Sequence, residues 1–344
     1  MTSAAPELAV GDSGQPALPW LAGPLAETLR RQRGHALLLH GPAGVGTLHF
    51  GVALAQAWLC EGEGQGGPRP CGRCASCHLV QRHLHPDLFV LLPEALRQAV
   101  SWPLVDDKPE GDDGKKKPSR QIRIDEVRAA IDWVTRTSGR GRGKVVLLHP
   151  AETLNLQSAN ALLKTLEEPP PGTRVLLGTA DPAHLLPTVR SRCQHVPLAA
   201  PPAEVAVAWL AEQGLKDADV LLAAASGRPL EAQALAEAGI DAAAWAALPR
   251  AVARGEAAAF AGWPVPRAVD ALQKLCHDAA AAAAGAAPRY FPAASLPPAG
   301  ALAPLVEWGD ELARVARHDE HPWNEGLLVD ALLAQARRAL TLRS

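Results

Sequence analysis

The sequence predicts an α/β protein in which a parallel sheet of phosphate-loop type is followed by a purely helical part. An apolar run at 36–39 leads into the glycine-rich turn 41–46 and then into a helical pattern, which is the order of a phosphate-loop unit. Further short apolar runs alternate with helical patterns, as is typical of a parallel sheet. After Val196 the strand signal fades, and Ala- and Leu-rich helical periodicity continues almost to the C-terminus.

The individual elements follow from periodicity and from the residues that stop helices. In chain order, the sequence predicts a helix over 20–33, a strand over 36–39, a helix from about 47 to 58, a strand over 87–92, a helix over 122–133, a strand over 145–148, a helix over 157–168 and a strand over 175–177. Three prolines from Pro169 stop the fourth helix, because proline lacks the backbone N–H that a helix needs. Beyond Val196, we expect a small set of helices that ends at about 238 and a longer helical block from about 242 to 342.

The composition excludes several classes of protein. At 344 residues the chain is long enough for two or three domains, and its 48% of hydrophobic residues excludes a mostly disordered protein. Its 34 Lys and Arg against 36 Asp and Glu give a net charge of -2, which disfavours independent binding to a polyanion such as DNA. The sequence has no secretory signal pattern and no apolar run of about 18 residues, so we expect a soluble, cytoplasmic protein without a membrane partner.

Four of the six cysteines are crowded between positions 60 and 77. Cys60, Cys71, Cys74 and Cys77 have the spacing C-x10-C-x2-C-x2-C, in which the short gaps turn consecutive thiolates toward one ion. Four sulfurs complete the tetrahedral shell of zinc and leave no open position, so the predicted zinc is structural and not catalytic. Reduced thiols without metal are the less favoured alternative. His78, His83 and His85 are less favoured candidates that could replace a cysteine as a zinc ligand.

The glycine-rich turn lacks the two side chains that carry phosphate-loop chemistry. In the pattern G-x-x-x-x-G-K-[ST], the lysine reaches the phosphates and the hydroxyl binds magnesium. Here Thr47 takes the lysine position and Leu48 the hydroxyl position. The turn keeps its glycines, Gly41, Gly44 and Gly46, whose backbone amides still suit an anion. The predicted site is therefore a degenerate phosphate loop.

A second position agrees with this interpretation. In an ATPase, the strand over 145–148 should end in acidic residues that hold magnesium and polarise water. His149 and Pro150 follow it instead. ATP hydrolysis at the chain's own site is therefore not expected. A turn in an unrelated fold is the alternative that the glycines alone leave open.

Several motifs, in order along the chain, resemble those of bacterial clamp-loader subunits of the AAA+ class. They cover about residues 19 to 240 and comprise, besides the cysteine cluster, HALLLHGPAGVG from His35, His85-Pro86-Asp87, NALLKTLEEPP from Asn160 and Ser191-Arg192-Cys193. Within this family the chain is similar to the delta-prime branch, because the gamma and tau branches keep the lysine and acidic residues that are missing here. The second sensor arginine of the family, expected three residues after Gly227, is replaced by Leu230.

The resemblance implies three domains. The implied domains are an AAA+ domain over 19–197, a helical lid over 198–241 and a helical collar over 242–344. The composition adds a flexible segment at 1–18 and a charged, solvated loop at 106–120, and the cysteine spacing adds the zinc module at 60–77. In this family the collar joins five subunits into an open ring.

Arg192 is the residue to which the resemblance assigns the most direct role. With Ser191 and Cys193 it forms the motif whose arginine, in this family, reaches into the ATP site of an adjacent gamma/tau subunit. A guanidinium suits this task, because it is permanently charged and stabilises phosphoryl transfer when supplied in trans. Thr179 matches the first sensor position and is interpreted as structural, and Lys164 is interpreted as a solvated lysine.

The implied function is that of a subunit without ATPase activity of its own in the DNA polymerase III clamp loader, an accessory to DNA-directed DNA synthesis in replication. The implied partners are gamma/tau and delta subunits, with the sliding clamp and primer-template DNA reached through the complex. The cofactor is structural zinc, with no ATP at the chain's own site. Two alternatives remain: an ATP-hydrolysing gamma/tau-like subunit, against which Thr47 and His149 argue, and a free-standing zinc-containing DNA-binding protein, which the net charge disfavours.

Overall fold

The computed structural model describes the chain apart from residues 1–6, 63–68, 104–117, 299, 318–324 and 342–344. Most of the charged loop predicted at 106–120 and part of the zinc module therefore lie outside the described residues. The chain forms two compact units that divide between Pro201 and Pro202.

The N-terminal unit is built on a parallel sheet of five strands in the order β2-β3-β4-β1-β5. The strands are β1 (Ala36–His40), β2 (Leu88–Leu91), β3 (Lys144–Leu148), β4 (Thr173–Thr179) and β5 (Gln194–Pro197). The first four correspond to the predicted strands, so the parallel α/β class is confirmed. The edge strand β5 was not predicted, because Val196 is its one buried side chain and its other three residues are exposed and polar or proline.

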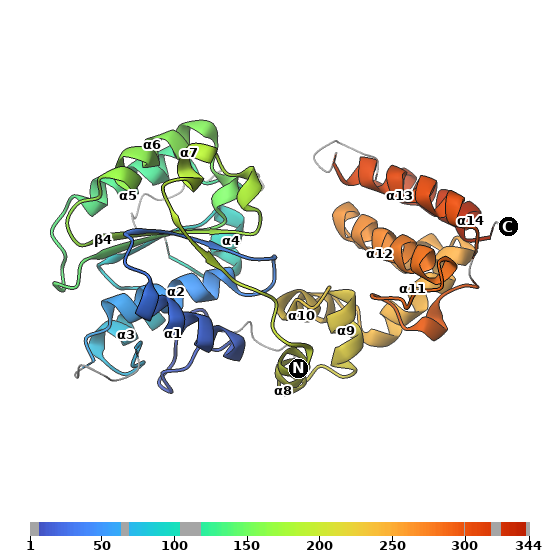
Figure 1. The fold of residues 1–344 in the computed structure, drawn as a ribbon, viewed down its shortest axis with the longest axis horizontal. Helices are drawn as coiled ribbons and strands as arrows, with labels where there is room; N and C mark the ends of the chain where they lie inside the picture. The colour runs from blue at the N-terminus through green and yellow to red at the C-terminus, as the bar shows by residue number, and fades with distance from the viewer. Residues whose placement is uncertain (1–6, 63–68, 104–117, 299, 318–324, 342–344) are drawn as a thin grey trace. The chain divides into compact units, whose positions relative to one another are not determined.

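Helices cover both faces of this sheet (Figure 1). They are α1 (Ala22–Arg31), α2 (Thr47–Leu59), α3 (Ala75–Gln81), α4 (Glu94–Ala99), α5 (Ile124–Val134), α6 (Leu156–Glu167) and α7 (Pro187–Arg190). Alternate residues of a strand point to opposite faces. Leu38 of β1 accordingly joins the core beneath α5, α6 and α7, whereas Leu39 lies against Gly51 of α2. Since both faces are covered, the central strands contain continuous apolar runs, such as 37–39 in β1 and 145–148 in β3.

The described part of the segment predicted to be flexible, from Glu7 to Leu18, departs from that expectation. The side-chain amide of Gln56, on α2, accepts from the Val10 N–H at 2.7 Å and donates to the Val10 carbonyl at 2.9 Å. Val10 and Leu18 are fully buried. A side-chain amide can pair with a backbone unit in this way without any regular secondary structure, so apolar periodicity gave no signal for it.

The C-terminal unit is helical. Its helices are α8 (Ala203–Glu212), α9 (Ala218–Ala224), α10 (Pro229–Glu237), α11 (Ala242–Arg254), α12 (Val265–Ala283), α13 (Leu302–Ala316) and α14 (Glu325–Thr341). One apolar cluster runs through it from Ala224 to Leu340, so the division into a lid and a collar stays a prediction. Among the helices that the structure describes, none combines the length and the apolar character that crossing a membrane requires.

A buried carboxylate holds the proline-rich segment that follows α12. Asp278 is fully buried and accepts three backbone N–H bonds, from Arg289 at 2.8 Å, Tyr290 at 2.7 Å and Phe291 at 2.8 Å. The Phe291 ring stacks on Trp245 with 4.8 Å between centroids. Charge-assisted bonds of this kind are short and strong, so one side chain fixes the turn where the sequence predicts only a break.

We therefore expect the substitution Asp278→Ala to destabilise the C-terminal unit by about 3 kcal/mol, because it removes the acceptor of three backbone N–H groups, of which that of Phe291 is buried. Urea unfolding followed by tryptophan fluorescence measures this change. Asp310→Ala, at an exposed position on α13, is the matched control and should change stability by no more than about 0.5 kcal/mol. Equal midpoints for the two variants would show that Asp278 does not hold the turn.

Candidate functional site

The four predicted cysteine ligands lie together between the end of α2 and the start of α3. Their sulfur atoms all lie within 4.8 Å of one another. The Sγ atoms of Cys60 and Cys74 are 3.9 Å apart, as are those of Cys71 and Cys77. A tetrahedral zinc site with bonds of about 2.3 Å places its sulfurs about 3.8 Å apart. The cluster therefore has the dimensions that a zinc ion requires.

Backbone amides surround these sulfurs and suit thiolates. Cys74 Sγ accepts from the amides of Glu61 and Cys77, and Cys60 Sγ accepts from those of Gly62 and Cys71, each at 3.4 Å. Burial raises the pKa of the Cys60 and Cys77 thiols. The pKa of Cys71 is lowered, in part by hydrogen bonds from the amides of Arg73 and Cys74. Ionising Cys60 and Cys77 inside the fold is costly without a nearby cation, so the thiolate form that the amide contacts suit requires a bound metal.

The substitute ligands considered from the sequence have other contacts. The His85 ring accepts from the Asp87 N–H at 3.0 Å through Nδ1, and its Nε2 lies 2.8 Å from Ser76 Oγ. His83 stacks on Trp102 with 4.0 Å between ring centroids. Neither histidine belongs to the sulfur cluster. His78 lies at the surface, with its Nε2 atom 3.6 Å from Asp12 Oδ1.

The motif His85-Pro86-Asp87 ties the cysteine module to the sheet. Asp87 is almost fully buried and accepts from Ser138 Oγ at 2.9 Å and from the amides of Gly139 and Arg140 at 2.7 and 2.8 Å. The Arg140 side chain then forms an ion pair with Glu61, next to Cys60. The motif gave no functional signal in the sequence, and its role in the structure is to anchor this loop.

The glycine-rich turn lies between β1 and α2, and the N-terminal segment packs over it. Gly46 has φ +96°, and a Cβ there would lie 2.4 Å from Leu18 Cδ1. Trp20 Nε1 donates to the Val45 carbonyl at 2.9 Å. Val45 and Leu18 are fully buried. One side of the turn is thus covered by the chain itself.

The positions that should carry nucleotide chemistry are filled by buried, uncharged groups. Thr47 and Leu48 are both buried. A Cβ on Gly178 would lie 3.3 Å from Thr47 Cγ2 and 2.6 Å from His149 Nδ1, so these three residues pack at the end of β3 and β4. Burial lowers the pKa of His149, which leaves the ring neutral at pH 7. These three side chains offer no cation for a phosphate and no carboxylate for magnesium, although the Glu152 carboxylate lies close enough to His149 to act on its pKa.

Thr179, which matches the first sensor position, lies at the end of β4. It is fully buried, and its Oγ1 accepts from the Asp181 N–H at 3.1 Å, which shapes the turn after β4. Lys164 is exposed on α6, as predicted for a solvated lysine.

Arg192 follows α7 and keeps its guanidinium at the surface, where a third of the side chain is exposed. Its Nε donates to Glu167 Oε1 at 2.5 Å, and its Nη1 donates to the Thr188 carbonyl at 2.8 Å. Ser191 caps the same turn through a 3.2 Å bond to Thr188. Burial raises the pKa of Cys193 to about 12, so this thiol is an inert packing group beneath the arginine. Glu167 belongs to the motif NALLKTLEEPP that begins at Asn160, but nothing in the sequence indicated its pairing with Arg192.

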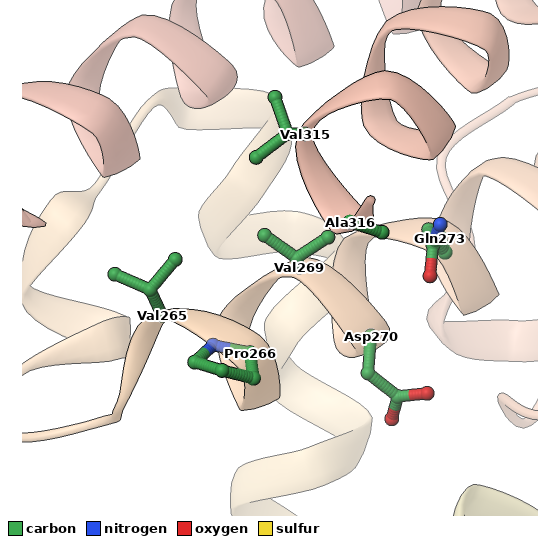
Figure 2. Close-up of a pocket in the computed structure, with 7 residues that line it drawn as sticks. All are labelled: Val265, Pro266, Val269, Asp270, Gln273, Val315 and Ala316. Carbon is green, nitrogen blue, oxygen red and sulfur yellow. The ribbon is translucent and has the colours of Figure 1, made fainter. Parts of the chain in front are cut away.

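A small hollow in the C-terminal unit is not a candidate active site. It has a volume of about 100 Å³ and lies between α12 and the end of α13, lined mainly by Val265, Val269 and Val315 (Figure 2). Asp270 at its rim is paired with Lys274 at 2.5 Å. Ligand sites are usually larger, about 300 Å³ or more, and carry convergent polar groups.

Comparison with protein families agrees with this geometry. The model of the family described as "DNA polymerase III, delta subunit" matches residues 24–202, more than half of the chain. The chain belongs to this family. Relatives confirm the similarity to its delta-prime branch: the DNA polymerase III subunit delta' of Pseudomonas aeruginosa is 39% identical over 214 residues, covering 60% of this chain and 57% of the relative. That of Escherichia coli is 36% identical, covering 63% and 60%.

More distant matches fit the same family. The DNA polymerase III subunit tau of Escherichia coli is 33% identical over 159 residues, which cover 46% of this chain and 20% of tau. A solved gamma subunit-related protein of Thermotoga maritima covers 92% of this chain and 99% of its own, with a TM-score of 0.50 and 16% identity. This likeness shows the fold alone. The matched part of the chain spans less than two thirds of the delta' relatives' length.

The cysteine cluster leads to a prediction about metal content. We expect elemental analysis of the purified protein to give about one zinc per chain, since four thiolates complete one tetrahedral shell. Cys77→Ser should abolish this zinc and lower thermal stability, because metal binding stabilises the loop that carries the ligands. Cys276→Ser is the matched control, as this buried cysteine lies outside the cluster. A folded protein that contains no zinc would refute the site.

Proposed function

We propose that this protein is a subunit of the DNA polymerase III clamp loader that hydrolyses no ATP itself. The names of its relatives, delta' and tau subunits of DNA polymerase III, support membership of that complex. In this proposal the chain is a stator: it holds its place in the assembly, supplies Arg192 to the ATP site of a neighbouring gamma/tau subunit and helps close the sliding clamp on primed DNA.

The observation that carries the proposal is the contrast between the chain's own glycine-rich turn and its surface arginine, Arg192. At the chain's own nucleotide loop, Thr47, Leu48 and His149 provide no charge for phosphate or magnesium. At the surface, Arg192 presents a permanently charged, ordered guanidinium. Phosphoryl transfer develops negative charge that such a group stabilises when a neighbouring subunit supplies it.

The helical unit supports a role in assembly. Leu302 and Val306 lie one turn apart on α13 and are 47% and 53% exposed. Large apolar side chains that share one exposed helix face are typical of surfaces that contact other subunits. We assign this unit the collar role, in contact with the gamma/tau and delta subunits. The net charge of -2 supports contact with primer-template DNA through the complex instead of by this chain alone.

The first test concerns ATP at the chain's own site. Equilibrium dialysis of the isolated protein with Mg-ATP should detect no binding in the micromolar range, because the charge-assisted contacts that hold the phosphates are missing. A gamma or tau subunit measured in parallel provides the positive control. Micromolar binding with turnover by this chain would instead support an ATP-hydrolysing gamma/tau-like subunit.

The second test concerns Arg192. In a reconstituted complex with gamma/tau and delta, Arg192→Ala should leave assembly intact and slow hydrolysis at the adjoining ATP site by about 10³-fold, the usual worth of an arginine finger. Single-turnover hydrolysis with clamp and primed DNA should therefore lose the phase contributed by that site. Arg31→Ala, which removes an exposed arginine paired with Glu27 on α1, is the matched control. Unchanged kinetics in Arg192→Ala would remove the finger role.

A further inference from the structure

Arg192 is not a freely moving surface side chain. Both its Nε and its Nη2 contact Oε1 of Glu167, and Glu167 is the last residue of α6. On the other side, Nη1 donates to the Thr188 carbonyl and lies 3.4 Å from Ser191 Oγ. The guanidinium is therefore held from two directions.

The backbone on both sides of this ion pair is fixed by the same core. Leu166 precedes Glu167, Cys193 follows Arg192, and both side chains are buried in the apolar cluster beneath α5, α6 and α7. Val189 of α7 joins this cluster as well. Because α6 and α7 share one packed core, the backbone positions from which the carboxylate and the guanidinium extend are fixed relative to each other.

The contacts engage one edge of the guanidinium and leave a donor on the other. Glu167 takes the edge formed by Nε and Nη2, and the Thr188 carbonyl takes one N–H of Nη1. A guanidinium has five N–H groups. The second N–H of Nη2 has no partner among the residues that the structure describes, so a donor remains for an incoming oxyanion.

We propose that Glu167 is the positioning residue for Arg192: it holds the Nε edge of the guanidinium so that the free end meets the phosphates of the neighbouring ATP. This inference rests on the finger role proposed above. Holding the side chain beforehand removes the entropy cost of ordering it during hydrolysis, since an arginine carries large rotamer freedom. Glu167 itself touches no nucleotide in this arrangement.

The test uses Glu167→Gln in the reconstituted complex. Glutamine keeps the size of the side chain but loses the charge that fixes the ion pair. The hydrolysis phase of the adjoining site should slow by about tenfold, which corresponds to part of the ordering of one arginine. Glu168→Gln is the matched control, because Glu168 is the next residue, is also exposed, and forms no side-chain hydrogen bond or ion pair in the described part of the chain. It should leave the phase unchanged.

A double variant separates positioning from a general structural effect. In the Arg192→Ala background, Glu167→Gln should slow hydrolysis no further, because its effect passes through the arginine. If Arg192→Ala removes the phase and Glu167→Gln leaves it intact or speeds it, the positioning role is wrong and the finger role stands. If Arg192→Ala has no effect, the finger role fails and the positioning role fails with it.

A second measurement uses the full isolated chain and needs no partner. The Nε–H of Arg192, observed by nitrogen-15 NMR, should exchange slowly with water in the unaltered protein and clearly faster in Glu167→Gln. Equal exchange rates in the two proteins would overturn the proposal, because the ion pair would then not hold the guanidinium in solution.

Discussion

The pairing of β1 with β4 on one side and β5 on the other is the constraint on which the rest of the N-terminal unit depends. Parallel pairing brings the carboxyl ends of these strands to one edge of the sheet, where ligands bind in such folds. The glycine-rich turn follows β1 there, and His149 follows β3. In this chain the edge is filled by Thr47, Leu48 and a neutral His149. The turn therefore lies at the sheet edge where such folds bind ligands, and these three side chains bring no charge to it.

The cysteine cluster is tied to the same framework. Cys60 follows α2, the helix that begins at the glycine-rich turn, and Cys77 lies on α3. Asp87 and the ion pair between Arg140 and Glu61 connect this module to the loop before β3. A metal ion bound there would brace the start of the sheet unit, far in sequence from Arg192. Cys276 has a separate, packing role, since its thiol donates to the Leu305 carbonyl at 3.1 Å between α12 and α13.

Local sequence patterns were enough to predict most of the strands and the cysteine cluster. Continuous apolar runs located the four buried strands, and cysteine spacing alone located four ligands whose sulfurs meet in the structure. The pattern failed where contacts are long-range or side chains are polar. The edge strand β5 has a single buried residue, and the packed segment near Val10 depends on a side chain 46 positions away. The partner of Arg192 is likewise 25 positions distant, so no local rule points to Glu167.

The function proposed above requires that Arg192 be held independently of the chain's own glycine-rich turn. The residues that hold the guanidinium, Glu167 and Thr188, lie on α6 and around α7 and depend on the core beneath those helices. The glycine-rich turn depends on contacts with the N-terminal segment at Leu18 and Trp20. These two sets of contacts share no residue. The orientation of the surface arginine therefore does not depend on the residues at the glycine-rich turn, as the function proposed above requires.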